Sequence, residues 1–117
     1  MADLILKTKI LEMLPYLEDR LGGFPKEQRY GLTIRIRDAG YDLLELSGDV
    51  ANGYFNTTTL KNLDRRKNAM LTYLDYALKR KLLSPHQHQV WGKYLVEIGR
   101  IIGGLMKAFS ARNKGMD

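Results

Sequence analysis

The sequence predicts an all-α protein, an antiparallel up-down-up-down bundle of four helices. Apolar residues recur at spacings of three and four along four segments, and no segment alternates apolar and polar residues as a strand would. The stretches between these segments are short, and short connections make successive helices antiparallel. The chain of 117 residues, 44% hydrophobic, has a length that suits one domain over residues 1–117, with one modest core.

The first helix is expected over roughly residues 3–22. Its apolar face recurs at helical spacing and consists of Leu6, Ile10, Met13, Leu17 and Leu21. Pro15 lies inside this pattern and has no N–H to donate, so we expect either a kink or a fresh helix start there. Gly22 and Gly23 end the helix, because glycine readily adopts the left-handed conformation of a C-terminal cap.

The second helix is expected from Pro25 to about Asn52. Proline suits the first helical turn, where its missing N–H costs nothing. The apolar positions form a seam of alternating four- and three-residue steps: Leu32, Ile36, Ala39, Leu43, Leu46 and Val50. Asn52-Gly53 marks the end of the helix, and residues 53–58 form a loop with several residues able to cap the next helix.

The third helix is expected over roughly residues 59–82. Its apolar face is formed by Leu60, Leu63, Met70, Leu74 and Leu78. Lys79, Arg80 and Lys81 fall in its last turn, where cations meet the negative end of the helix dipole. Part of this cluster would therefore stabilise the helix even if it binds no ligand.

The fourth helix has the clearest start. Ser84 at the N-cap, Pro85 at the first helical position and Gln87 at the third form a capping box. The helix is expected to run to about Ala111, with residues 112–117 as a frayed tail. Its wide apolar stripe predicts burial by the bundle and by a neighbouring subunit, and consists of Val90, Trp91, Tyr94, Leu95, Ile98, Ile101, Ile102, Leu105 and Phe109.

Glycines inside this fourth helix require an explanation, because each costs about 1 kcal/mol relative to alanine. They are Gly92, Gly99, Gly103 and Gly104. The first three share a face, and the spacing of Gly99 and Gly103 allows another backbone to approach closely. Tight packing inside the bundle is favoured over contact with a second subunit, although both would need the missing side chain.

The positive charge is concentrated in the second half of the sequence. Residues 1–60 carry seven Lys or Arg and nine Asp or Glu, whereas residues 61–117 carry twelve and four, so the halves have formal charges of −2 and +8. A strongly basic half indicates a surface that binds a polyanion such as nucleic acid. The alternative is a lysine-rich helical surface whose charge only keeps the protein in solution.

The third helix is the best candidate for a nucleic-acid-binding surface. Arg66, Tyr73 and Arg80 are spaced by seven, so they lie along one stripe where arginine would neutralise phosphates and tyrosine would stack on bases. The alternative is a solvated cationic face with Tyr73 packed at its edge. The full candidate set is Lys61, Arg65, Arg66, Tyr73, Lys79, Arg80, Lys81 and Lys93, which would be extended by Arg35, Arg37, Arg100 and Lys107.

No arrangement of residues predicts catalysis, a metal or a cofactor. The chain has no cysteine and no glycine-rich phosphate loop. His86 and His88 are two apart and point to different faces of a helix, and Asp75 and Glu97 are expected in ion pairs with nearby cations. Because no catalytic arrangement is found, we expect a protein that is not an enzyme. No apolar run reaches the length of a membrane span or forms a signal-peptide core, so we expect the protein in the cytoplasm.

Three groups of segments resemble a known family. They are Leu14-Pro15-Tyr16-Leu17 with Phe24-Pro25-Lys26 and Arg29-Tyr30; Ala51-Asn52 with LKNLD at 60–64; and LSPHQ at 83–87 with EIGRIIGG at 97–104. The third group is the most specific. Together they resemble small bacterial and phage four-helix bundles, which include the accessory variability determinant proteins of diversity-generating retroelements. The family also includes proteins encoded in intervening sequences of large-subunit ribosomal RNA genes.

The resemblance implies a function that composition alone does not predict. Accessory variability determinants form a homopentameric barrel with a basic surface, associate with a reverse transcriptase and its template RNA, and support synthesis of mutagenised cDNA without catalysing it. The motif positions Glu97, Gly99, Arg100 and Gly103 would then serve packing and assembly. This sequence departs from the family pattern at Gly22-Gly23, and at Leu105 where many relatives carry tryptophan. The alternatives are a bundle of the ribosomal intervening-sequence type and a structural oligomer without a polymerase partner.

Overall fold

The computed structural model describes residues 2–115, with side chains over residues 4–112, and within this range the chain is helical and has no strand. Its elements are α1 (Ala2–Gly22), a short 3₁₀ helix η1 (Lys26–Gln28), α2 (Leu32–Ala51), α3 (Thr57–Lys79) and α4 (Pro85–Gly115). The predicted all-α four-helix bundle is confirmed. None of these helices combines the length and the apolar character needed to cross a membrane.

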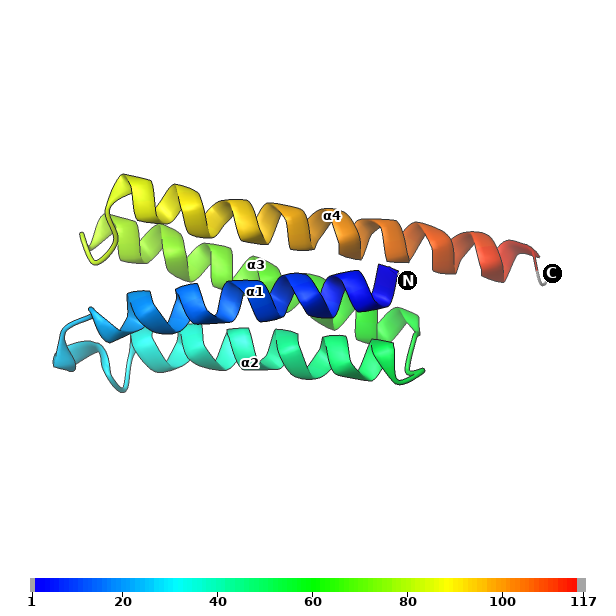
Figure 1. Cartoon of the computed structure of the whole chain (residues 1–117), viewed down its shortest axis with the longest axis horizontal. Helices are drawn as coiled ribbons and strands as arrows, with labels where there is room; N and C mark the ends of the chain where they lie inside the picture. The colour runs from blue at the N-terminus through cyan, green and yellow to red at the C-terminus, as the bar shows by residue number, and fades with distance from the viewer. Residues whose placement is uncertain (1, 116–117) are drawn as a thin grey trace.

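The four helices close into a cycle. α1 packs on α2, α2 on α3, α3 on α4 and α4 on α1, whereas diagonally opposite helices in the described range do not pack together. Successive helices run in opposite directions, as Figure 1 shows, so the up-down-up-down arrangement is confirmed. One end of the bundle, the double-loop end, therefore carries both the α1–α2 connection (residues 23–31) and the α3–α4 connection (residues 80–84).

The core consists of the apolar faces that the periodicity predicts. All five predicted residues of α1 are buried, and Trp91 of α4 is fully buried against them. Leu46 and Phe109 are partly buried and pack at the edge of this core. On α3, Ala77 rather than Leu78 occupies the buried position.

The predicted start of the second helix at Pro25 is wrong. Pro25 begins only a single 3₁₀ turn, in which the Gln28 amide donates to the Pro25 carbonyl. α2 begins at Leu32, because Gly31 has a non-helical backbone (φ −115°, ψ −111°) that interrupts the path. Glycine adopts such a conformation without the steric penalty that a side chain would bring.

The boundaries of α1 and α3 are set by local features. α1 continues through Pro15, so a fresh helix start there is excluded. α3 begins at Thr57, two residues earlier than predicted, because the Asn56 side chain accepts a hydrogen bond from the Thr59 amide at 2.9 Å. It ends at Lys79, three residues before the predicted end at residue 82.

The capping box at the start of α4 is confirmed. The Gln87 amide donates to the Ser84 hydroxyl at 3.1 Å, and the Ser84 amide donates to the Gln87 side chain at 3.0 Å. α4 continues to Gly115, so residues 112–115 are helical and not the frayed tail that the sequence predicts. The rest of that predicted tail, residues 116–117, lies outside the described residues.

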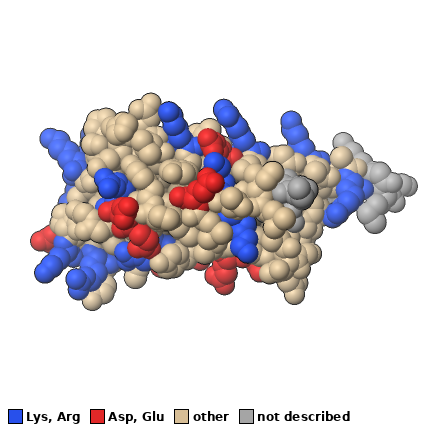
Figure 2. All heavy atoms as spheres, in the orientation of Figure 1, with Lys and Arg blue, Asp and Glu red and all other residues tan. Residues whose placement is uncertain are grey.

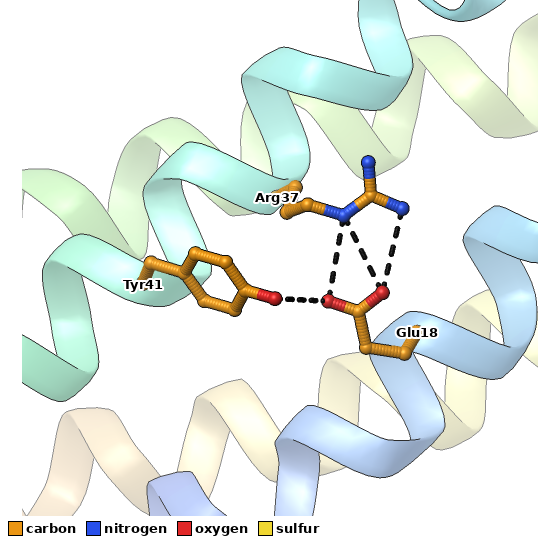
Figure 3. A network of polar contacts seen from close by, with 3 residues as sticks. All are labelled: Glu18, Arg37 and Tyr41. Carbon is orange, nitrogen blue, oxygen red and sulfur yellow. Dashed lines mark hydrogen bonds and ion pairs between the residues drawn. The ribbon is translucent and has the colours of Figure 1, made fainter.

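Polar contacts hold α1 against α2 outside the core. Figure 3 shows the Glu18 carboxylate of α1 between two side chains of α2. It accepts from the Tyr41 hydroxyl at 2.7 Å and from the Arg37 guanidinium at 3.4 Å. The hydrogen bond to Glu18 raises the pKa of the Tyr41 hydroxyl. Arg37 is therefore engaged within the bundle.

Candidate nucleic-acid interface

Arg65 and Arg66 lie in an acidic groove between α2 and α3. The Arg66 guanidinium is 3.9 Å from the Asp42 carboxylate, and the groove forms a hollow of about 400 Å³. Its lining includes Asp42, Glu45 and Asp49, which follow one flank of α2. These carboxylates would repel phosphate groups, and Asp42 partly compensates the charge of Arg66.

The predicted stripe of Arg66, Tyr73 and Arg80 is divided among three environments. Arg66 faces the acidic groove, and Tyr73 is partly buried against the core. Arg80 donates a hydrogen bond to the Tyr76 hydroxyl at 3.2 Å, and its guanidinium carbon lies 5.8 Å from the centre of that ring. The exposed aromatic ring on this helix is therefore that of Tyr76, which the sequence analysis did not select.

The candidate residues do not form one continuous patch. Lys61 and Lys79 are about 27 Å apart along α3, at about 1.5 Å per residue. Lys61 lines a hollow with Met106 and Phe109 of α4, near the far end of the bundle. Lys93 lies on the outer side of α4, beside Val96. Their role in binding stays a prediction, and any shared ligand would have to span much of the bundle.

Cations from the end of α3 and from both connections lie at the double-loop end. Lys79, Arg80 and Lys81 are exposed at the end of α3, and Lys26 and Arg29 are exposed in the α1–α2 connection. Figure 2 shows Lys and Arg side chains in an upper and a lower group at this end, with acidic and uncharged surface between the two groups. None of these five forms an ion pair with any side chain that the structure describes. We call these five residues the basic end.

Lys26 and Arg29 were missed because they are distant from residues 79–81 in sequence. Only the topology reveals their proximity, since an up-down-up-down bundle places the first and third connections at the same end. Because the up-down-up-down topology was predicted, the shared end of the two connections was predictable too, and Lys26 and Arg29 could have been included among the candidates.

Lys81 occupies a position that usually belongs to glycine. Its φ of 60° is the left-handed conformation, and it is the only non-glycine residue with positive φ in the described range. The Lys81 amide donates to the Leu78 carbonyl and the Leu82 amide to the Ala77 carbonyl, which is a Schellman cap. A side chain in this conformation costs about 1 kcal/mol relative to glycine, so the chain retains a cation here at the expense of stability.

Lys81→Gly is expected to raise the free energy of unfolding by roughly 0.5–1 kcal/mol, because relief of the left-handed strain exceeds the entropy that glycine adds to the unfolded chain. Urea unfolding followed by circular dichroism measures this change. Lys79→Gly is the matched control and should lower the stability by about 1 kcal/mol, because position 79 is helical. An unchanged or lowered stability for Lys81→Gly would show that the cap carries no strain.

The motif residue Glu97 connects α4 to α1. Its carboxylate is 2.8 Å from the Lys9 ammonium, which also lies 3.1 Å from Glu12. The hydrogen bond from Lys9 lowers the pKa of Glu97, and the bonds to Glu97 and then Glu12 raise the pKa of Lys9. Arg100 is exposed beside this pair. Glu97 therefore forms an ion pair between α4 and α1, and its role in packing and assembly stays a prediction.

Three glycines of α4 are not explained by packing within the chain. A Cβ atom placed on Gly92, Gly103 or Gly104 would meet no atom within 4 Å, whereas one on Gly99 would lie 3.1 Å from the Lys67 ammonium. The favoured explanation of tight packing inside the bundle is thus wrong for the first three. Gly104 is exposed, whereas Gly92 and Gly103 are half-buried at the edge of the bundle.

His88 and the two carboxylates Asp75 and Glu97 belong to separate ion pairs. His88 Nε2 lies 2.9 Å from Asp75, while Glu97 pairs with Lys9. Asp75 and Glu97 therefore do not form a carboxylate pair. In the part of the chain that the structure describes, no three His, Asp or Glu residues are placed to hold a metal ion.

Comparison with known proteins gives one match. No curated protein and no solved structure matches this chain. A family model described as bAvd-like matches residues 4–109, which is most of the sequence and includes all four helices. The chain therefore belongs to the bAvd-like family, the accessory variability determinants of diversity-generating retroelements.

Proposed function

We propose that this protein is a non-catalytic accessory subunit that binds the reverse transcriptase of a diversity-generating retroelement and its template RNA or cDNA. The observation that carries the nucleic-acid part is the basic end, where five exposed cations from the end of α3 and both connections are free of ion pairs within the described residues. Cations held in ion pairs have less charge to offer to phosphates, which favours this end over the groove at Arg66.

The polymerase part of the proposal follows from the family. The bAvd-like match supports an accessory role in such a retroelement, and the resemblance of the motifs implies association with its reverse transcriptase. Co-purification of the chain with the polymerase encoded beside it tests this association. A chromosomal neighbourhood with neither a reverse transcriptase gene nor a template and variable repeat would contradict it.

We further propose that several copies of the chain assemble, with five copies implied by the family resemblance. The support is the surface of α4 outside the core, and we call four of its residues the glycine face: Gly92, Val96, Gly103 and Gly104. Val96 is half exposed there, at the edge of a hollow of about 520 Å³ that it shares with Leu71 and Gly92. Small residues around an exposed apolar side chain would let the helix of another copy approach closely.

Lys79→Glu combined with Lys81→Glu is expected to weaken binding of nucleic acid more than tenfold at about 100 mM salt, because two phosphate contacts are replaced by repulsion. The slope of log K against log salt should fall in magnitude by roughly 1.4, the value for two contacts on a single strand. Fluorescence anisotropy with a labelled oligonucleotide measures both quantities.

The matched control reverses two charges elsewhere on the same helix, Lys61→Glu with Arg65→Glu. We expect it to keep most of the affinity and the salt slope, since these residues lie away from the basic end. An equal loss in both double variants would mean that binding depends on net charge alone. A wild-type protein that binds no nucleic acid at low salt would contradict the proposed function itself.

A further inference from the structure

Two exposed tyrosines accompany the cations of the basic end. Tyr30, next to Arg29, has 85% of its surface exposed, more than any other large apolar or aromatic side chain in the described range. Tyr76, on the last turns of α3, is 51% exposed and contacts Arg80. An exposed ring beside cations without ion pairs offers a nucleic acid both a stacking platform and a countercharge.

The register of α2 and α3 places these two rings at the same level of the bundle. The helices are antiparallel neighbours, and Arg66 of α3 lies opposite Asp42 of α2. Counting from that pair in opposite directions, Tyr76 is level with Leu32, the first residue of α2. Tyr30 comes just before this residue in the chain, so the two rings lie at a similar height along the bundle, Tyr30 in the α1–α2 connection and Tyr76 on α3.

The Tyr76 ring is held in place by its neighbour. Arg80 lies one turn later on α3, donates a hydrogen bond to the Tyr76 hydroxyl at 3.2 Å and lies beside the face of the ring. A ring that is already ordered loses little conformational freedom when a ligand stacks on it. The same arginine keeps a positive charge beside the ring.

Cations alone would not distinguish single strands from duplexes, because both present phosphates. Stacking does distinguish them, since the bases of a duplex are already paired and stacked inside the helix, while unpaired bases are available to an aromatic side chain. The combination of Lys79 and Lys81 with two exposed rings is therefore typical of a surface for unpaired nucleotides.

We infer that the basic end selects single-stranded nucleic acid over duplex, with phosphates at Lys79 and Lys81 and unpaired bases stacked on Tyr30 and Tyr76. This inference rests on the proposed function, because it assigns the form of nucleic acid bound at the same surface. The recognised chemistry, a phosphate chain with free bases, is common to RNA and DNA.

The test replaces both rings at once, Tyr30→Leu with Tyr76→Leu, which keeps an apolar side chain and the net charge. Anisotropy is measured with a 12-nucleotide oligo(U), the matching oligo(dT) and a 12-base-pair duplex of mixed sequence. We expect affinity for both single strands to fall at least tenfold, since each stacked ring contributes about that much or more. Affinity for the duplex should stay within twofold, and the salt slope should not change.

Two further variants isolate the effect of the rings. Tyr30→Phe with Tyr76→Phe keeps both rings, removes the hydroxyl that Arg80 bonds, and should retain most of the single-strand affinity. Tyr54→Leu removes a ring that is 65% exposed at the opposite end of the bundle, and it should also have no effect. Circular dichroism confirms that each variant is folded.

The outcomes separate this inference from the proposed function. Wild-type affinity in the double leucine variant, or equal losses for single strands and duplex, would overturn single-strand selection. Loss of all binding in the Lys79→Glu and Lys81→Glu variant would support the proposed function, whether or not single-strand selection is overturned. Failure of the wild type to bind any of the three probes would overturn both. Stronger binding of oligo(U) than of oligo(dT) would identify RNA as the ligand, and the reverse would identify DNA.

Discussion

Replacing Gly40 by leucine is expected to lower the free energy of unfolding by about 3 kcal/mol, at the upper end of the usual cost of overpacking a core. A Cβ atom at this position would lie 2.7 Å from Leu17 Cδ1, 3.3 Å from Leu14 Cδ2 and 3.4 Å from Met70 Cε. Leucine adds three more carbon atoms beyond that Cβ. Urea unfolding followed by circular dichroism at 222 nm measures the loss.

The cost is high because the surrounding side chains have no room to move. Leu17 and Met70 are fully buried, and they bring α1 and α3 against the same glycine of α2. Protein interiors are packed as densely as organic crystals, so three helices would have to separate to admit the new side chain. Gly40 is thus the glycine where the bundle itself needs a missing side chain.

Gly48 provides the matched control on the same helix. A Cβ atom there would meet nothing within 4 Å, so Gly48→Leu should leave the fold intact and Gly48→Ala should stabilise it by about 1 kcal/mol. If leucine at positions 40 and 48 had the same effect, the close approach of α1, α2 and α3 around Gly40 would be wrong.

Most of the core could be predicted from the sequence, because burial in a helix follows directly from spacing. The apolar faces of α1 and α4 lie where the three- and four-residue steps place them, down to Trp91 at the centre. The capping box was also readable, since it depends on three residues that are close in sequence. Both features are local, and local patterns do not require knowledge of the partner helix.

The start of α2 could not be predicted, because two local signals compete there. Pro25 favours a helix start and does begin a turn, but the chain needs Gly31 as a second, later break before α2 can pack on α1. Gly31 falls outside the apolar seam, and an isolated glycine near a helix start is compatible both with a continuous helix and with a break. Which of the two forms depends on tertiary packing.

The candidate site was only partly predictable for a similar reason. The spacing of Arg66, Tyr73 and Arg80 correctly places them along one helix flank, but that flank faces acidic residues of α2 for part of its length. Which cations remain free depends on the neighbouring helix. Lys79, Arg80 and Lys81 remain free because they lie beyond the packed region, at the end of α3.

Gly92→Gln combined with Gly103→Gln is expected to abolish assembly while leaving each chain folded. Both positions open onto space in the isolated chain, so glutamine fits there without a clash. In an assembly the added side chains would hold the neighbouring helix several ångströms away, which removes the close contact on which such interfaces depend. Native mass spectrometry and sedimentation velocity should therefore show monomers where the wild type gives an oligomer.

The stability of the monomer provides the decisive control. Glutamine forms helices better than glycine by roughly 0.5 kcal/mol or more per site, so the monomeric double variant should resist unfolding better than a wild-type chain diluted to the monomer. Gly48→Gln makes the same change on α2 and should leave the oligomer intact. A double variant that still assembles would show that the glycine face is not the interface, and a monomeric wild type would contradict assembly altogether.

The glycine substitutions are expected to change monomer stability and assembly in opposite directions. Glycine at positions 92, 103 and 104 weakens α4 by about 1 kcal/mol per residue, and no contact within the described chain requires it, in contrast to Gly40. A substitution that makes the chain more stable and the assembly weaker would locate the benefit of those glycines outside the single chain. The same surface would then explain why the apolar stripe of α4 is wider than one bundle core requires.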